Sequence, residues 1–138
     1  MGMTKRSKKP EVRDVIEDVE IAAAPDRVIA LLGGKELASW RHKKGEIAFR
    51  FDLVGEHIVA RLRVNMMTPA FIALACVSTS VDLGWTETRV HLAVARTANG
   101  ARVALVHAGV PANGATREVW RGLLQELKSW LEAAAVAA

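Results

Sequence analysis

The sequence contains a single cysteine, Cys76, which excludes an internal disulfide and a metal site built from several cysteines. Long apolar runs are also missing. The longest candidates, residues 71–77 and the alanine-rich C-terminus, are shorter than the roughly 20 residues that cross a bilayer. The first residues are basic and polar, without the apolar stretch of a secretory signal. We therefore expect a soluble, cytoplasmic protein with no integral membrane association.

The sequence also lacks the common catalytic motifs. No glycine-rich loop leads from a strand into a helix to cradle a phosphate, and no serine stands between the glycines of a nucleophile elbow. The four histidines contain no pair at i, i+4, and Cys76 lies in an apolar strand, where burial would leave it inert. We predict no catalytic residue, no metal and no cofactor.

The positive charge is concentrated at the N-terminus. The chain has 19 basic and 15 acidic residues, and four of the basic ones (Lys5, Arg6, Lys8 and Lys9) lie in the first ten residues, which contain no acid. The remaining 15 basic residues therefore balance the 15 acidic ones. We predict a basic disordered tail over residues 1–14 and one domain over residues 15–138, with no nucleic-acid partner.

The N-terminal part of this domain predicts a strand followed by two short helices. Apolar residues alternate over residues 15–21, as in a half-buried strand. Pro25 suits the first position of a helix, which Gly33 and Gly34 would end. A second short helix is expected over residues 35–40.

The middle of the chain has the period of two that is typical of an antiparallel sheet with one buried face. Strands are expected over residues 47–53, 58–66, 71–77, 86–96 and 102–108, and Asn99-Gly100 predicts a tight hairpin between the last two. Five arginines fall on the outward positions, where they could form a basic face for an anionic partner or simply be solvated: Arg50, Arg61, Arg63, Arg89 and Arg102.

The C-terminus predicts one long helix, with Thr116 as a possible cap and apolar residues at helical spacing from Trp120 to Leu131. A strand, two short helices, about five antiparallel strands and a long helix together predict an α+β fold. In it, a curved sheet would wrap around the C-terminal helix and leave an apolar cavity between the two layers.

Four segments in this order resemble the SRPBCC superfamily (the START and birch-pollen-allergen class), and within it the activator of the heat-shock ATPase. They are Ile21-Ala-Ala-Ala-Pro-Asp-Arg-Val28, Trp85-Thr-Glu-Thr88, Gly100-Ala-Arg-Val-Ala-Leu-Val-His-Ala-Gly109 and Trp120-Arg-Gly-Leu-Leu-Gln-Glu-Leu-Lys128. Glu87 stands where the family often has glycine, and Val119 precedes Trp120 where glycine is common. The resemblance implies the helix-grip fold and a hydrophobic ligand between sheet and helix.

His107 is the most informative polar residue, because it shares the inward phase of Val103 and Leu105. It could contact a ligand, act as an acid–base group or only bond a neighbouring group in the core. Our leading hypothesis is a non-enzymatic module that binds a small hydrophobic ligand through ten residues: Phe49, Phe51, Leu62, Val64, Met66, Leu92, Leu105, His107, Trp120 and Leu124.

Two other hypotheses belong to different classes. One is a protein-interaction module that resembles a co-chaperone, and the other is a cyclase or hydrolase with His107 as its acid–base group. The apolar segment 71–77 could also form the surface of a homodimer.

Overall fold

The computed structural model describes residues 11–34, 36–37 and 39–137, and the side chains among them as far as residue 134. Neither helix in this part of the chain is long and apolar enough to cross a membrane. The strands are β1 (Val12–Ile21), β2 (Trp40–Lys43), β3 (Glu46–Leu53), β4 (Glu56–Met67), β5 (Phe71–Thr79), β6 (Arg89–Thr97) and β7 (Gly100–Pro111), and the helices are α1 (Pro25–Leu32) and α2 (Thr116–Ala137).

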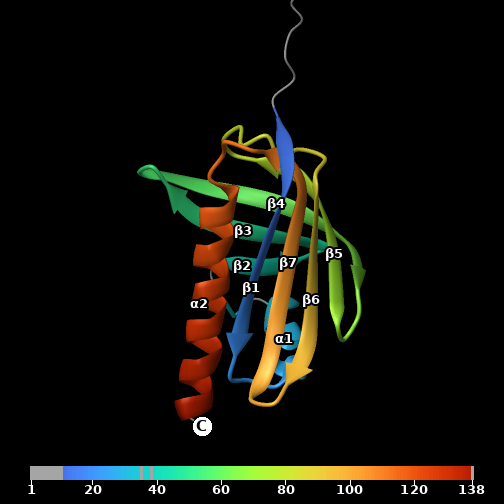
Figure 1. The fold of residues 1–138 in the computed structure, drawn as a ribbon, viewed down its shortest axis with the longest axis vertical. Helices are drawn as coiled ribbons and strands as arrows, with labels where there is room; N and C mark the ends of the chain where they lie inside the picture. The colour runs from blue at the N-terminus through green and yellow to red at the C-terminus, as the bar shows by residue number, and fades with distance from the viewer. Residues whose placement is uncertain (1–10, 35, 38, 138) are drawn as a thin grey trace, which may run out of the picture.

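All seven strands form one antiparallel sheet in the order β1-β7-β6-β5-β4-β3-β2. The sheet is strongly curved, and α2 runs along β1 while also contacting β3, near the other end of the sheet (Figure 1). This is the α+β helix-grip fold that the sequence predicts. Its core lies between the inward side chains of the strands and the apolar stripe of α2, which includes Trp120, Leu124 and Leu127.

A bulge in β7 explains the glycine of the His-x-Gly segment. Val15 pairs with His107 and Arg13 pairs with Val110, so two residues of β7 stand opposite the single Asp14 of β1. One of the two is Gly109, whose φ of 74° is costly for residues with a Cβ. The extra residue interrupts the alternation of inward and outward side chains along β7. His107 and Val110, which would face opposite sides of a regular strand, are therefore both buried.

A second irregularity overturns one of our expectations. Val64 pairs with Leu74 while Met66 pairs with Ala73, which leaves Asn65 as an extra residue in β4. The alternation is therefore interrupted, and Met66 is 52% exposed while Met67 packs against the core. The prediction that Met66 faces the interior is wrong, because a strict period of two does not hold across a bulge.

The N-terminal boundaries also differ from the prediction. The proposed tail is too long, because residues 12–14 already belong to β1, which pairs with β7 from Val12 onward. Residues 1–10 lie outside the described part. The second short helix was expected over residues 35–40, of which 35 and 38 are not described. Leu37 forms an isolated bridge with Trp40, and Trp40 begins β2, so the last residue of this segment is extended rather than helical.

The segment Trp85-Thr-Glu-Thr88 is a turn, although we expected a strand from Thr86. The N–H of Thr88 donates to the carbonyl of Trp85 at 2.9 Å, and Glu87 has a φ of 68°. A positive φ at the third residue of a turn is typical of type II, which favours glycine there. The turn therefore places Glu87 in a conformation that glycine adopts more easily, and strand β6 begins only at Arg89.

The predicted hairpin between β6 and β7 is present, with Ala98 and Asn99 as the residues of its turn. Gly100 is required for another reason than the turn itself. A Cβ at Gly100 would lie 2.2 Å from the carbonyl oxygen of Ile21, so only glycine lets the end of β1 approach this closely.

At both edges of the sheet, backbone groups form hydrogen bonds with other parts of the same chain. On β1, Arg117 donates to the carbonyl of Ile16 at 3.0 Å and Lys128 donates to that of Glu20 at 2.8 Å. At the other edge, the N–H of His42 donates to the carbonyl of Gly34 at 3.0 Å. Occupied edge groups are poor templates for another strand, which disfavours edge-to-edge association at these positions.

The turn between β3 and β4 is strained at Val54. Val54 and Gly55 have φ values of 49° and 76°, as in a type I′ turn, which favours asparagine followed by glycine. A β-branched residue in this conformation is a genuine outlier, and the Val54 side chain is 98% exposed, so no packing compensates for the strain.

We therefore predict that Val54→Asn raises the free energy of unfolding by about 1 kcal/mol, because asparagine tolerates a positive φ. The measurement is urea denaturation followed by circular dichroism. Val12→Asn is the control, since Val12 is also exposed but lies in the extended backbone of β1. If the two variants change stability equally, Val54 is not strained.

Candidate functional site

Aromatic rings fill the centre of the molecule between the sheet and α2. The indoles of Trp85 and Trp120 stack with their centroids 5.8 Å apart and an angle of 7° between the planes. Phe49 meets Trp120 edge-on at 5.1 Å, and Trp40 meets Phe49 edge-on at 4.6 Å. All four side chains are 1% exposed or less, so this cluster is a packed core.

A chain of hydrogen bonds runs through these rings and determines the tautomer of His107. The indole N–H of Trp120 donates to Nδ1 of His107 at 3.0 Å, so Nδ1 must be an acceptor. The proton of the neutral ring therefore lies on Nε2, which donates to Oγ1 of Thr88 at 2.7 Å. The Thr88 hydroxyl in turn donates to the carbonyl of Trp85.

The same network anchors the start of α2. Thr116, which we considered as a helix cap, instead accepts a hydrogen bond at Oγ1 from the indole N–H of Trp85, at 3.0 Å. Trp85 thus holds the first turn of the helix, while Trp120 holds the second turn through His107.

Burial makes His107 unsuitable for proton transfer at neutral pH. Its side chain is fully buried, and desolvation lowers its pKa from the ordinary 6.5 to about 4. The ring is therefore neutral at pH 7, and both of its nitrogens already have partners. Neither nitrogen is available to a substrate unless this network opens.

The ten predicted ligand-binding residues do not form one lining. Phe51 and Val64 are half-buried, and Met66 points outward. The other seven are 2% exposed or less and belong to the packed core: Phe49, Leu62, Leu92, Leu105, His107, Trp120 and Leu124. Of the ten, only Phe51 lines the largest hollow found among the described residues.

That hollow is an open groove of about 770 Å³ between α2 and the adjoining ends of β3 and β4. Its apolar floor consists of Phe51, Val119 and Leu123. Gly122 leaves the helix side of the groove open, because a Cβ built there would meet no atom within 4 Å. The other lining residues are polar: Ser39, Arg50, Asp52, His57, Glu118, Gln125, Glu126 and Ser129.

Two of the polar contacts in the groove are well defined. Nδ1 of His57 lies 2.9 Å from Oδ1 of Asp52, and both side chains are exposed. On the helix side, the Ser39 hydroxyl donates to Oε1 of Glu126. The Ser39 contact links the residue before β2 to α2.

Sequence reasoning missed most of this groove because its residues come from different elements. Gly122 interrupts an otherwise good helix-forming stretch, and this was the one local clue to an opening on α2. Ser39 and Glu126 are polar residues in ordinary contexts, and only the packing of α2 beside β3 brings them together.

A smaller hollow of about 410 Å³ lies beside the groove, at the start of α2. It shares Val119 with the groove, and its lining includes Leu53, Leu83, Trp85 and Pro111.

Other candidate chemistry in the described residues is weak. Burial raises the pKa of the Cys76 thiol to about 11, so the thiol is protonated at neutral pH. Within residues 11–34, 36–37 and 39–137, no three histidine, cysteine, aspartate or glutamate side chains are grouped so that they could hold a metal ion.

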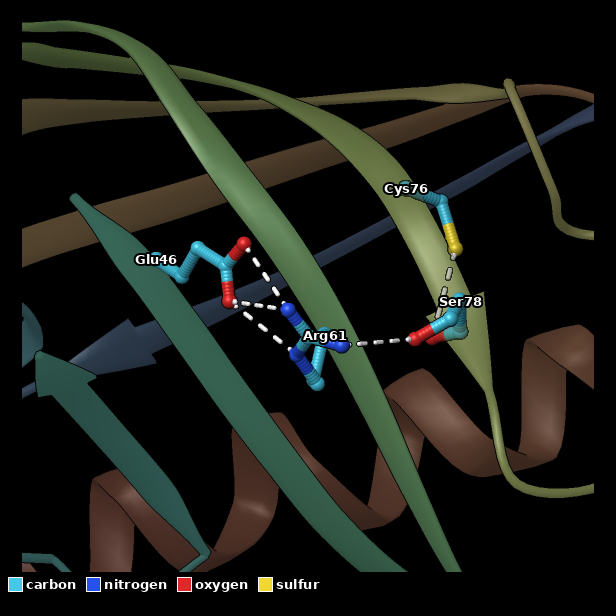
Figure 2. Close-up of polar contacts among 4 residues, drawn as sticks. All are labelled: Glu46, Arg61, Cys76 and Ser78. Atoms are coloured by element: carbon cyan, nitrogen blue, oxygen red, sulfur yellow. Dashed lines mark hydrogen bonds and ion pairs between the residues drawn. The ribbon is translucent and has the colours of Figure 1, made fainter. Parts of the chain in front are cut away.

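The outward arginines are partly tied to neighbouring side chains. Figure 2 shows the guanidinium of Arg61 between the carboxylate of Glu46 and the hydroxyl of Ser78, with Nε 3.0 Å from Glu46 Oε1. Arg102 pairs with Asp18 at the other end of the sheet. These pairs favour an ordinary solvated face over a basic surface that includes all five arginines.

No family model matches this chain, and no curated protein matches its sequence. Solved structures do match. The Aha1 dimer from Colwellia psychrerythraea aligns with a TM-score of 0.64 and 17% identity, over 86% of this chain and 96% of that one. The ginseng major latex-like protein 151 from Panax ginseng aligns with a TM-score of 0.67 and 12% identity, over 89% of this chain and 97% of that one.

A protein from Chromobacterium violaceum, solved by structural genomics, aligns with a TM-score of 0.64 and 17% identity, over 87% of this chain and 98% of that one. At such low identity these alignments show the shared fold alone.

The depressed pKa of His107 predicts a loss of stability in acid. The unfolded chain binds a proton near pH 6.5 and the folded chain only near pH 4, so folding becomes less favourable as the pH falls between these values. We predict that the difference in unfolding free energy between the original protein and His107→Gln shrinks by about 3 kcal/mol from pH 7 to pH 4. Urea denaturation at each pH measures it.

The exposed His91→Gln is the control for this experiment, and its stability should follow that of the original protein at every pH. A constant difference for His107→Gln would contradict the burial of a neutral imidazole.

The contribution of the Trp120 indole hydrogen bond to the free energy of unfolding can be measured with a matched pair of variants. Trp120→Phe removes the donor to His107, whereas Trp40→Phe removes an indole N–H that has no acceptor among the described residues. Both remove similar ring volume, so we predict that Trp120→Phe costs about 1–3 kcal/mol more in unfolding free energy, measured by thermal and urea denaturation. Equal losses would show that the Trp120–His107 bond contributes nothing.

Proposed function

We propose that this chain is a member of the SRPBCC superfamily that acts as a binding module without catalysis. Its ligand would be a small hydrophobic molecule that lies in the groove between α2 and the ends of β3 and β4. The observation that carries this proposal is the apolar floor of Phe51, Val119 and Leu123, which is open to solvent beside Gly122.

The size and composition of the groove support this function. Small-molecule sites commonly occupy about 300–1,000 Å³ and combine an apolar lining with a few polar groups. The groove has a volume of about 770 Å³, and its polar groups lie around an apolar floor. It also lies between the sheet and the C-terminal helix, which is where the resemblance implies a ligand.

The packed centre favours the groove over a cavity in the core. A ligand among the rings of Trp85 and Trp120 would have to separate a stacked pair and break the bonds of His107. Buried polar groups that lose their partners cost about 1–3 kcal/mol each. A ligand in the groove leaves this network intact, so it needs no such rearrangement.

A protein-interaction module is the second candidate, and the observation that favours it is Val54. This valine is almost fully exposed at the tip of a hairpin and retains a strained conformation, as residues at contact sites can. Native mass spectrometry of gently purified protein separates the candidates. A small added mass that is lost on denaturation supports the ligand, whereas a stoichiometric protein partner that is lost in Val54→Asn supports the interaction module.

The groove can be filled without disturbing the core. We predict that Gly122→Leu abolishes binding of N-phenyl-1-naphthylamine, a neutral apolar dye, because the new side chain would occupy the open space beside Phe51 and Leu123. The fold should be at least as stable as before, since replacing a glycine inside a helix contributes about 1 kcal/mol. Dye fluorescence and thermal denaturation measure the two effects.

Ala133→Leu is the matched control, because Ala133 is exposed on the same helix but does not line the groove. It should leave dye binding unchanged. Binding that persists in Gly122→Leu would place the dye outside the groove and contradict the proposed site.

A further inference from the structure

Acidic side chains outnumber basic ones around the groove. Three carboxylates line it, from Asp52, Glu118 and Glu126, against a single guanidinium from Arg50. Counting aspartate, glutamate, lysine and arginine side chains, the lining has two more negative than positive charges. The chain outside its first ten residues has equal numbers of acidic and basic residues, so this excess is a local feature of the groove.

Two of the carboxylates lie along the helix wall of the groove. Glu118, Gly122 and Glu126 are spaced four residues apart on α2, so they follow one another along one side of the helix, at about 6 Å per step. Gly122 provides an open space between the two acids. A group that enters there would lie within several ångströms of both carboxylates.

Neither of the two helix carboxylates forms an ion pair with a described residue. Glu126 accepts a hydrogen bond from the Ser39 hydroxyl, which leaves its negative charge in place. Glu118 has no ion pair among the described residues, whereas Asp52 is paired with the imidazole of His57 at 2.9 Å. All three residues are exposed at the rim of the groove, so salt screens their charges, and their negative potential favours a cation there at low ionic strength.

We infer that the ligand of this groove is an apolar molecule that carries a protonated amine. The inference rests on the proposed function and adds the charge of the ligand. Its apolar body would cover Phe51, Val119 and Leu123, and its ammonium group would lie between Glu118 and Glu126, above Gly122. A carboxylate at the same place would be repelled by both acids.

Three probes with the same ten-carbon chain test this inference: decylamine, decanol and decanoate. Each is titrated into the full chain below its aggregation concentration, at low and at high salt, with isothermal titration calorimetry. We expect decylamine to bind about tenfold more tightly than decanol at low salt, and decanoate to bind most weakly. High salt should reduce the advantage of the amine.

Variants then assign the effect to the two glutamates. The double variant Glu118→Gln, Glu126→Gln keeps the side-chain size and should bring decylamine to within about twofold of decanol. Glu87→Gln removes an exposed carboxylate outside the groove and should leave the advantage unchanged. Arg50→Gln should increase the preference for the amine.

The outcomes separate this inference from the proposed function. If decanol or decanoate binds as tightly as decylamine, and Gly122→Leu abolishes that binding, the inference is overturned while the groove remains the ligand site. An amine preference that survives the double variant also overturns it. If none of the probes binds, or if binding persists in Gly122→Leu, the proposed function fails as well.

Discussion

The hydrogen bond from the Trp120 indole to Nδ1 of His107 joins the C-terminal helix to strand β7 of the sheet, and both side chains are fully buried. The acceptor stabilises the core because an indole N–H without a partner is costly in an apolar environment. Once Nδ1 accepts, the proton lies on Nε2 and the ring can donate to Thr88. This contact therefore sets the tautomer of His107 and, together with the bond from Trp85 to Thr116, holds the start of α2 against the core.

The packed centre separates stability from binding. Because the rings of Trp40, Phe49, Trp85 and Trp120 occupy the space between sheet and helix, the opening available to a ligand lies at the side, where α2 passes the ends of β3 and β4. Side chains in that groove can change without breaking the hydrogen bonds of the core. Gly122 is the clearest example, since a Cβ there would meet no atom within 4 Å.

Local departures from ideal strands also shape the molecule. The bulge at Gly109 buries both His107 and Val110, and the extra residue Asn65 turns Met66 outward. Bulges add curvature and twist, which a sheet needs when it wraps around a helix. The same curvature brings β3 close to the polar side of α2, so the acidic lining of the groove depends on it.

The sequence by itself determined the fold class, the inward position of His107 and the apolar stripe of α2, because periods of two and of 3.6 residues are local properties of the chain. It did not determine the groove, the outward turn of Met66 or the extended conformation of Trp40. Pairing register, bulges and the distance between α2 and β3 result from how all the elements pack together. Residues that contribute to a site from separate elements, such as Ser39 and Glu126, therefore become neighbours only in the tertiary structure.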